Sequence, residues 1–142
     1  MINYVTGFMF SKDKKHVSLI SKLQPSWQNG KLNGIGGKIE AGESPQQAMA
    51  REFAEEAGIE THPEEWRLFT VLTRPEVYRV NFLYMFDDRV YSVKSVEKEI
   101  VNIYETSVLP DNVIYNLRWL IPMAADEHLR FDKAVEITEM RG

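Results

Sequence analysis

Runs of apolar and β-branched residues alternate with polar segments along the chain. Two such runs, 4–10 and 17–23, flank the polar segment 11–15, and together they predict a β-hairpin. A loop is expected over 24–31, and a strand interrupted by glycines over 32–39. Further strands are predicted over 66–72, 78–86, 99–105 and 131–138, with 99–105 the weaker pattern.

Two segments have the apolar spacing of helices. Residues 116–127 show this spacing, although Pro122 either kinks the helix or marks its start. The second helix is expected after Ser44, which is a suitable N-cap, with Pro45 at the first helical position and Gln47 completing a capping box. Its apolar stripe consists of Ala48, Met49, Phe53 and Ala57, and Gly58 is expected to end it. Mixed strands with two helices predict an α/β or α+β sandwich.

Length and composition limit the function classes. The 142 residues are expected to form a single domain, 1–142, with ordinary fractions of apolar (44%) and charged (27%) residues. A net charge of -4 disfavours nucleic acid or anionic membrane as partners through bulk electrostatics. Cysteine is absent, which excludes disulfides and thiolate metal sites and permits a cytoplasmic location. We expect a cytoplasmic protein, since neither a signal peptide nor a membrane-length apolar run is apparent.

Candidate chemistry is concentrated in the helix that follows Ser44. Glu52, Glu55 and Glu56 place three carboxylates within five residues, at spacings where like charges repel on a helix. A divalent cation reverses the sign of this interaction, because Mg²⁺ takes oxygen ligands and bridges carboxylates to phosphates. The glycines that precede the helix allow the backbone to approach a ligand closely. This segment is therefore the predicted functional site.

The same segment resembles the signature of the Nudix hydrolases. The match covers 37–59 and fills every fixed position of the signature, with Gly37, Glu43, Arg51, Glu52, Phe53, Glu55, Glu56, Gly58 and Ile59. The resemblance implies an α/β/α sandwich with a mixed central sheet and a pyrophosphohydrolase that uses Mg²⁺, with Mn²⁺ as a substitute. An acid-rich solvated helix is the alternative interpretation, but it accounts for neither the glycine loop nor the Arg-Glu pair.

Roles within the motif follow from the resemblance by position. It implies that Glu52, Glu55 and Glu56 bind the metal, that Glu52 or Glu55 is the catalytic base, and that the Gly36 carbonyl is a further ligand. Structural roles are expected for Gly37, Glu43, Arg51 and Gly58, with Glu43 and Arg51 forming an ion pair. Surface roles are expected for the later carboxylates Glu97, Glu99 and Glu105, and surface or packing roles for His16, His62 and His128.

The substrate is indicated by residues outside the motif. Asn33 and the glycines after it resemble a segment of MutT-like enzymes that sanitise oxidised purine nucleotides, in which an asparagine contacts the base. An amide donates and accepts hydrogen bonds, which suits a purine edge, but Asn33 also suits a turn. Lys38 is a candidate phosphate contact or a solvated lysine. Trp27 and Trp119 are candidates for stacking on a base or for core and rim positions.

These features predict Mg²⁺-dependent hydrolysis of an ordinary or oxidised nucleoside triphosphate to the monophosphate and pyrophosphate. Activity on ADP-ribose, nucleotide sugars or dinucleoside polyphosphates is the alternative, and the position of Pro75 resembles a proline of ADP-ribose pyrophosphatases. A non-catalytic nucleotide-sensing module is the alternative of another class. The expected partner is a small nucleotide, bound by a monomer or homodimer, with neither nucleic acid nor membrane involved.

Overall fold

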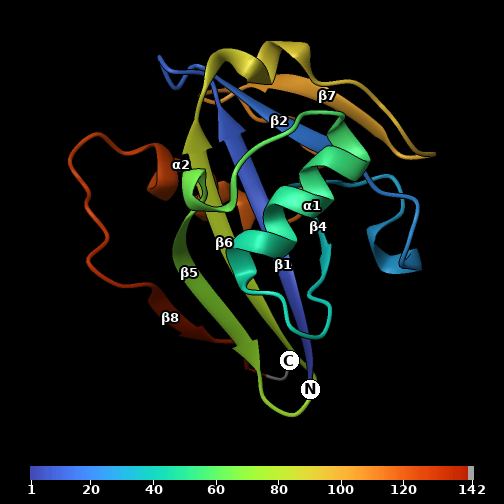
Figure 1. Cartoon of the computed structure of the whole chain (residues 1–142), viewed down its shortest axis with the longest axis vertical. Helices are drawn as coiled ribbons and strands as arrows, with labels where there is room; N and C mark the ends of the chain where they lie inside the picture. Colours follow the sequence, from blue (N-terminus) through green and yellow to red (C-terminus); the bar gives the residue numbers. More distant parts are fainter. Residues whose placement is uncertain (141–142) are drawn as a thin grey trace.

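A mixed eight-stranded sheet with an α-helix on each face is the architecture of the computed structural model, which describes residues 1–140 (Figure 1). The helices are α1 (Pro45–Ala57) and α2 (Leu117–Ala125). Three short 3₁₀ turns lie in the connections, at Ser26–Gln28, Pro63–Glu65 and Asp88–Ser92. The strands are β1 (Ile2–Phe10), β2 (His16–Ser21), β3 (Leu32–Asn33), β4 (Ile35–Lys38), β5 (Arg67–Arg74), β6 (Tyr78–Phe86), β7 (Ile100–Glu105) and β8 (Val135–Thr138).

Strand β1 lies at the centre of the sheet and has three different partners. It runs parallel to β6 and antiparallel to β4, and it pairs with β2 at Phe10 and Val17. The predicted hairpin is thus present at its turn, after which β2 diverges to pair with β3 and β7. Strands β5 and β8 extend the sheet on the far side of β6, so that the order is β3-β2-β1-β6-β5-β8.

The alternation of side chains along β1 divides the apolar core into two layers. Val5 and Met9 belong to the layer that includes α1, whereas Phe8 and Phe10 belong to the layer that includes α2. The α1 layer is completed by Met49, Phe53, Ala57, Trp66, Leu83 and Met85. The α2 layer is completed by Leu19, Phe69, Phe82, Leu117, Leu120 and Ile121. The predicted α/β/α sandwich with a mixed sheet is confirmed.

Helix α1 has the ends that its sequence predicts. The Ser44 side chain accepts a hydrogen bond from the Gln47 N–H, and the Gln47 side chain accepts one from the Ser44 N–H. Pro45 occupies the first turn, where its missing N–H costs nothing. Gly58 adopts the left-handed conformation (φ 73°) and its N–H caps the Ala54 carbonyl. Local side-chain chemistry therefore fixes both ends of the acidic helix.

Two expected strands differ from the structure, and the helix expected over 116–127 is present with one of the two alternatives for Pro122 excluded. Helix α2 begins at Leu117, so Pro122 lies inside it and does not mark its start. The buried side chains of the helix belong to the apolar core layer on this face of the sheet, and they are Leu117, Leu120, Ile121 and Ala124. The expected strand 32–39 is divided at Gly34, because β3 pairs with β2 whereas β4 pairs with β1. The expected strand 131–138 is ordered as a strand only over Val135–Thr138. Within residues 1–140, neither helix has the length and apolar character needed to cross a bilayer.

Candidate active site

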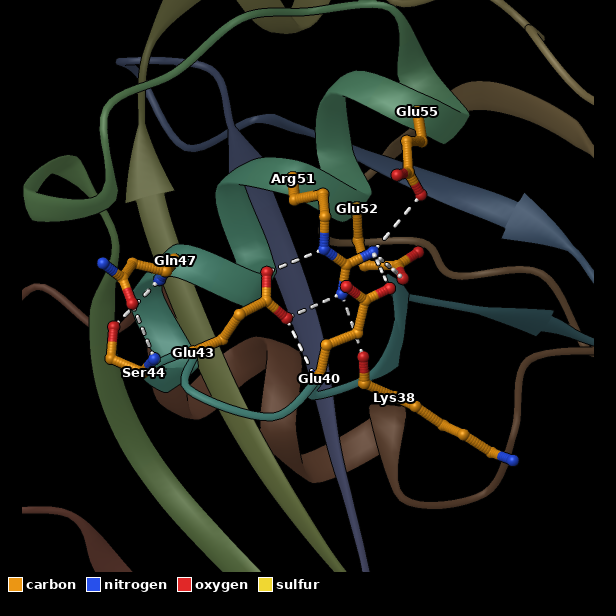
Figure 2. Close-up of polar contacts among 8 residues, drawn as sticks. All are labelled: Lys38, Glu40, Glu43, Ser44, Gln47, Arg51, Glu52 and Glu55. Atoms are coloured by element: carbon orange, nitrogen blue, oxygen red, sulfur yellow. Dashed lines mark hydrogen bonds and ion pairs between the residues drawn. The ribbon is translucent and has the colours of Figure 1, made fainter.

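Arg51 connects the glycine-rich strand, the following loop and helix α1. Its Nε and Nη2 atoms donate to the two carboxylate oxygens of Glu43 at 2.8 and 2.9 Å, and Nη2 also donates to the Lys38 carbonyl at 3.0 Å (Figure 2). The expected ion pair between Glu43 and Arg51 is present with two-point geometry, which is the stronger form of such a pair. The Arg51 hydrogen bond lowers the pKa of the Glu43 carboxyl. The loop 38–43 is thereby fixed against α1.

The remaining guanidinium nitrogen of Arg51 holds two of the three acidic side chains. Its Nη1 donates to Glu52 Oε1 at 2.8 Å and to Glu55 Oε2 at 3.4 Å (Figure 2). The Glu52 side chain is 12% exposed and the Glu55 side chain is 50% exposed. Burial raises the pKa of Glu52, even though the bond to Arg51 acts in the opposite direction. Glu52 is therefore the less exposed of the two carboxylates and the one that Arg51 holds at the shorter distance.

The observed position of the Glu52 carboxylate depends on the absence of a side chain at Gly37. A Cβ atom on Gly37 would lie 2.6 Å from Glu52 Oε1, which is closer than such contacts allow. At Gly36, a Cβ atom would lie 1.8 Å from the Val5 carbonyl oxygen of the neighbouring strand. The two glycines thus let β4 lie directly against β1 on one side and against the Glu52 carboxylate on the other.

Glu56 lies in a different environment from the residues that contact Arg51. Its Oε2 atom is buried and has no hydrogen-bond partner in the part of the chain that the structure describes. Burial, together with the negative charge of Glu52, raises the pKa of Glu56 to about 8. The side chain lines a cleft of about 680 Å³, whose other walls are Ile20, Lys22, Leu23, Gln24, Val96, Glu97, Lys98 and Glu99. We refer to this space as the acidic cleft.

The segment 94–99 forms one wall of the acidic cleft because it caps the end of α1. The N–H groups of Lys94 and Val96 donate to the Ala57 and Glu56 carbonyls at 3.0 and 3.4 Å. This placement brings Glu97 and Glu99 to the same cleft as Glu56. Glu97 is exposed, as expected from the sequence.

The expected surface role is wrong for Glu99. Its side chain is 18% exposed and accepts hydrogen bonds from Lys22 Nζ at 2.9 Å and from the Leu23 N–H at 2.6 Å. Glu105 is exposed on β7, in agreement with its expected role. The three histidines also agree with expectation: His62 and His128 are exposed, and His16 packs edge-on against Tyr91.

Of the predicted metal ligands, Glu56 lines the acidic cleft, together with Glu97 and Glu99, whereas Glu52 and Glu55 are not part of its lining. The carboxylates of the cleft fit a hard divalent cation. Carboxylate oxygens are the ligands that Mg²⁺ prefers, and the buried, unpartnered Glu56 oxygen is a group that a cation would stabilise. In the side-chain conformations present in residues 1–140, no three carboxylate or imidazole groups converge on one point. Arg51 engages both Glu52 and Glu55, whereas the Glu56 Oε2 atom has no hydrogen-bond partner in the described residues.

A second cavity, of about 330 Å³, lies on the α2 side of the sheet. Two of the candidate substrate contacts, Trp27 and Asn33, belong to it, and Trp27 is 59% exposed at its edge. Trp119 is not part of its lining, and Lys38 is exposed and extends away from the Arg51 cluster (Figure 2). We refer to this space as the aromatic cavity. It is also lined by Tyr4, Thr6, Pro25, Leu72, Arg74, Tyr78, Val80, Phe82, Ile114, Tyr115, Asn116 and Glu139.

The Asn33 side chain holds its own loop in this structure. Its Oδ1 accepts from the Gly34 N–H at 2.8 Å, and its Nδ2 donates to Gln28 Oε1 at 3.2 Å. One amide hydrogen and one lone pair remain for a ligand, because an amide side chain has two of each. The turn-holding role and the base-contacting role are therefore compatible.

Sequence reasoning missed the far wall of the aromatic cavity. There, the Tyr78 hydroxyl donates to Glu139 Oε2 at 2.8 Å, and Arg74 lies 3.8 Å from the same carboxylate. Burial and the bond to Glu139 raise the pKa of Tyr78 to about 12. These residues come from β5, β6 and the end of the chain, and no local motif connects them. Only the pairing of β5 with both β6 and β8 brings them together.

Comparison with known proteins extends the similarity beyond 37–59. A family model described as the NUDIX domain matches residues 3–136. A structure from a study of MutT of the fish pathogen Aliivibrio salmonicida and of Vibrio cholerae is 25% identical, with a TM-score of 0.64, over 84% of this chain and 96% of that chain. A MutT protein from Bacillus halodurans has a TM-score of 0.70 at 18% identity, over 97% of this chain and 88% of that chain. The second similarity concerns the fold alone.

Proposed function

The chain belongs to the Nudix family, and from this premise we propose that it hydrolyses nucleoside triphosphates to the monophosphate and pyrophosphate with Mg²⁺. Members of this family are typically pyrophosphohydrolases that use a divalent metal. The observation that carries the proposal is that an acidic cleft and an aromatic cavity share one loop, residues 22–31. A nucleotide has the matching division into an anionic phosphate chain and a flat aromatic base.

The acidic cleft is assigned to the phosphate chain. A bound Mg²⁺, held by Glu52, Glu55, Glu56 and the Gly36 carbonyl oxygen, would neutralise phosphate oxygens and acidify a water molecule. The protein itself provides the acceptor for the proton of the attacking water. We assign this role to Glu52, because burial raises its pKa and Arg51 fixes its position, whereas Glu55 is half exposed.

The aromatic cavity is assigned to the base. Trp27 and Tyr115 provide exposed rings at its edge, and stacking on such rings suits any nucleobase. Asn33 and Asn116 add amide groups, which donate and accept, as the edge of a purine requires. The similarity to MutT proteins supports an oxidised purine triphosphate as the compound to test first.

The test is a hydrolysis screen with dNTPs, 8-oxo-dGTP, ADP-ribose, a nucleotide sugar and a dinucleoside polyphosphate, with Mg²⁺, with Mn²⁺ and with EDTA. We expect metal-dependent release of pyrophosphate from a triphosphate. Strong preference for ADP-ribose would overturn the substrate and keep the reaction class. Nucleotide-dependent thermal stabilisation without any hydrolysis would indicate a sensing module instead of an enzyme.

A matched pair of variants connects the activity to the acidic cleft. Glu56→Gln keeps the shape of the side chain but removes a charge from the proposed metal ligands. We expect kcat to fall by roughly a hundredfold or more, in line with losses when electrostatic groups are removed from active sites. The control is Glu105→Gln, which changes an exposed carboxylate on β7. Equal activity of the two variants would place the metal elsewhere.

A further inference from the structure

The loop between β2 and β3, residues 22–31, contributes to both cavities. Lys22, Leu23 and Gln24 line the acidic cleft, whereas Pro25 and Trp27 line the aromatic cavity. The same loop includes Gln28, whose side-chain oxygen accepts the hydrogen bond from Asn33. The position of this loop therefore determines the shape of the aromatic cavity and the orientation of the Asn33 amide.

Glu99 holds this loop from the side of the acidic cleft. Its Oε2 accepts from the backbone N–H groups of Leu23 and Gln24, at 2.6 and 3.4 Å, and its Oε1 pairs with Lys22 Nζ at 2.9 Å. Burial by itself would raise the pKa of Glu99, but the bonds from Leu23 and Lys22 hold it below the ordinary value. The charged carboxylate is thus the form that the loop stabilises.

We propose that Glu99 is a positioning residue for base recognition, which acts by holding the loop 22–31 in the conformation that shapes the aromatic cavity. The inference rests on the proposed function, because it takes the aromatic cavity as the base site. Without Glu99, the N–H groups of Leu23 and Gln24 lose their acceptor and Lys22 loses its counter-charge. The loop then has more conformations, and ligand binding has to restrict them, which reduces affinity.

A matched control lies two residues away. Glu97 lines the same acidic cleft and has the same charge, but its side chain is exposed and makes no hydrogen bond or ion pair with other residues in the range 1–140 that the structure describes. A general electrostatic effect on the cleft would appear in both Glu97→Ala and Glu99→Ala. An effect through the loop would appear only in Glu99→Ala.

The experiment compares the unsubstituted protein with Glu99→Ala, Glu99→Gln and Glu97→Ala in EDTA. Amide hydrogen exchange reports the order of residues 22–33, and calorimetric titration with dGMP and 8-oxo-dGMP reports base binding. For Glu99→Ala we expect faster exchange in this loop but not in α1, and a Kd that rises roughly tenfold, the effect of losing hydrogen bonds to a charged group. Glu99→Gln keeps an acceptor oxygen and should recover part of the affinity. Glu97→Ala removes a charge from the same cleft but should leave the exchange of residues 22–33 unchanged, so any change of its Kd measures the electrostatic effect alone.

Several results would overturn the inference. One is a Glu99→Ala variant in which the hydrogen exchange of the loop and the Kd for the nucleotide are both unchanged. If the affinity of this variant for Mg²⁺ also falls, Glu99 acts through the ion and not through the loop. Another is the absence of binding of either nucleotide by the unsubstituted protein in EDTA. Failure of the proposed function would be a different result, namely that no triphosphate is hydrolysed with Mg²⁺. Nucleotide binding and loop exchange in EDTA are measured independently of hydrolysis, so the two failures can be told apart.

Discussion

Arg51 and Glu43 are joined at two points, with Nε 2.8 Å from one carboxylate oxygen and Nη2 2.9 Å from the other. This geometry leaves Nη1 directed at Glu52, the residue that we assign as the base. The pair therefore orients the Glu52 carboxylate through the fixed shape of one guanidinium group. A lysine at position 51 has a single nitrogen and cannot make the same set of contacts.

We predict that Arg51→Lys lowers the free energy of unfolding by about 1–3 kcal/mol, because several charge-assisted hydrogen bonds are lost from a mostly buried side chain. The activity should fall further than the loss of folded protein explains, since Glu52 is no longer held. Urea unfolding and kcat under native conditions measure the two effects. Arg67→Lys, an exposed position on β5, is the control. A stability and kcat equal to those of the control would contradict the orienting role.

The two adjacent glycines of β4 separate a folding effect from a site effect. At Gly36, a methyl group would collide with the Val5 carbonyl oxygen, which belongs to the backbone and cannot move without disrupting the sheet. At Gly37, the collision is with the end of the Glu52 side chain, which can turn away. We expect Gly36→Ala to reduce the yield of folded protein. Gly37→Ala should fold with little loss of thermal stability and lose most of its activity. Full activity in Gly37→Ala would show that Glu52 does not need its observed position.

The raised pKa of Glu56 predicts how stability depends on pH without metal. The folded-state pKa is about 8, against an ordinary value of 4.5, so the folded protein binds more protons between these values than the unfolded chain does. The free energy of unfolding should therefore decrease as the pH rises through this interval, and the loss should be complete above about pH 8. In EDTA, Glu56→Gln should weaken this dependence, because only the part due to Glu52 remains, and it should be the more stable protein at about pH 9. The measurement is thermal unfolding of both proteins across this pH range. If their unfolding temperatures changed with pH in parallel, the prediction would be wrong.

The acidic helix was predictable because its determinants are local. The Ser44 cap, its partner Gln47 and the final Gly58 lie on or beside the element that they define, and each has the geometry that its residue type favours. The division of 32–39 into β3 and β4 was not predictable in this way. It depends on pairing with two different strands, because residues 32–33 pair with β2 and residues 35–38 pair with β1.

The hydrogen bonds that Glu99 accepts from the loop 22–31 were not predictable for the same reason. Its partners, Leu23 and Gln24, are 76 and 75 residues away in the sequence, and an isolated glutamate before a strand resembles any solvated one. The aromatic cavity also combines residues from distant segments, such as Trp27, Tyr78 and Glu139. The sequence thus predicted the ends and the acidic face of helix α1, whereas the aromatic cavity that we propose as the base site became visible only in the folded chain.

Asn33 offers a test of base recognition that separates its two roles. Asn33→Asp keeps an oxygen that accepts from the Gly34 N–H, so the turn is retained, but it removes the donor to Gln28 and adds a negative charge. If Asn33 contacts the base, KM for the preferred triphosphate should rise roughly tenfold or more with little change in thermal stability, because a buried polar group of the ligand is left unpaired. Gln28→Ala is the control, since it removes the Asn33 partner without altering the amide itself. A KM that rises equally in both variants would show that Asn33 serves the loop and does not read the base.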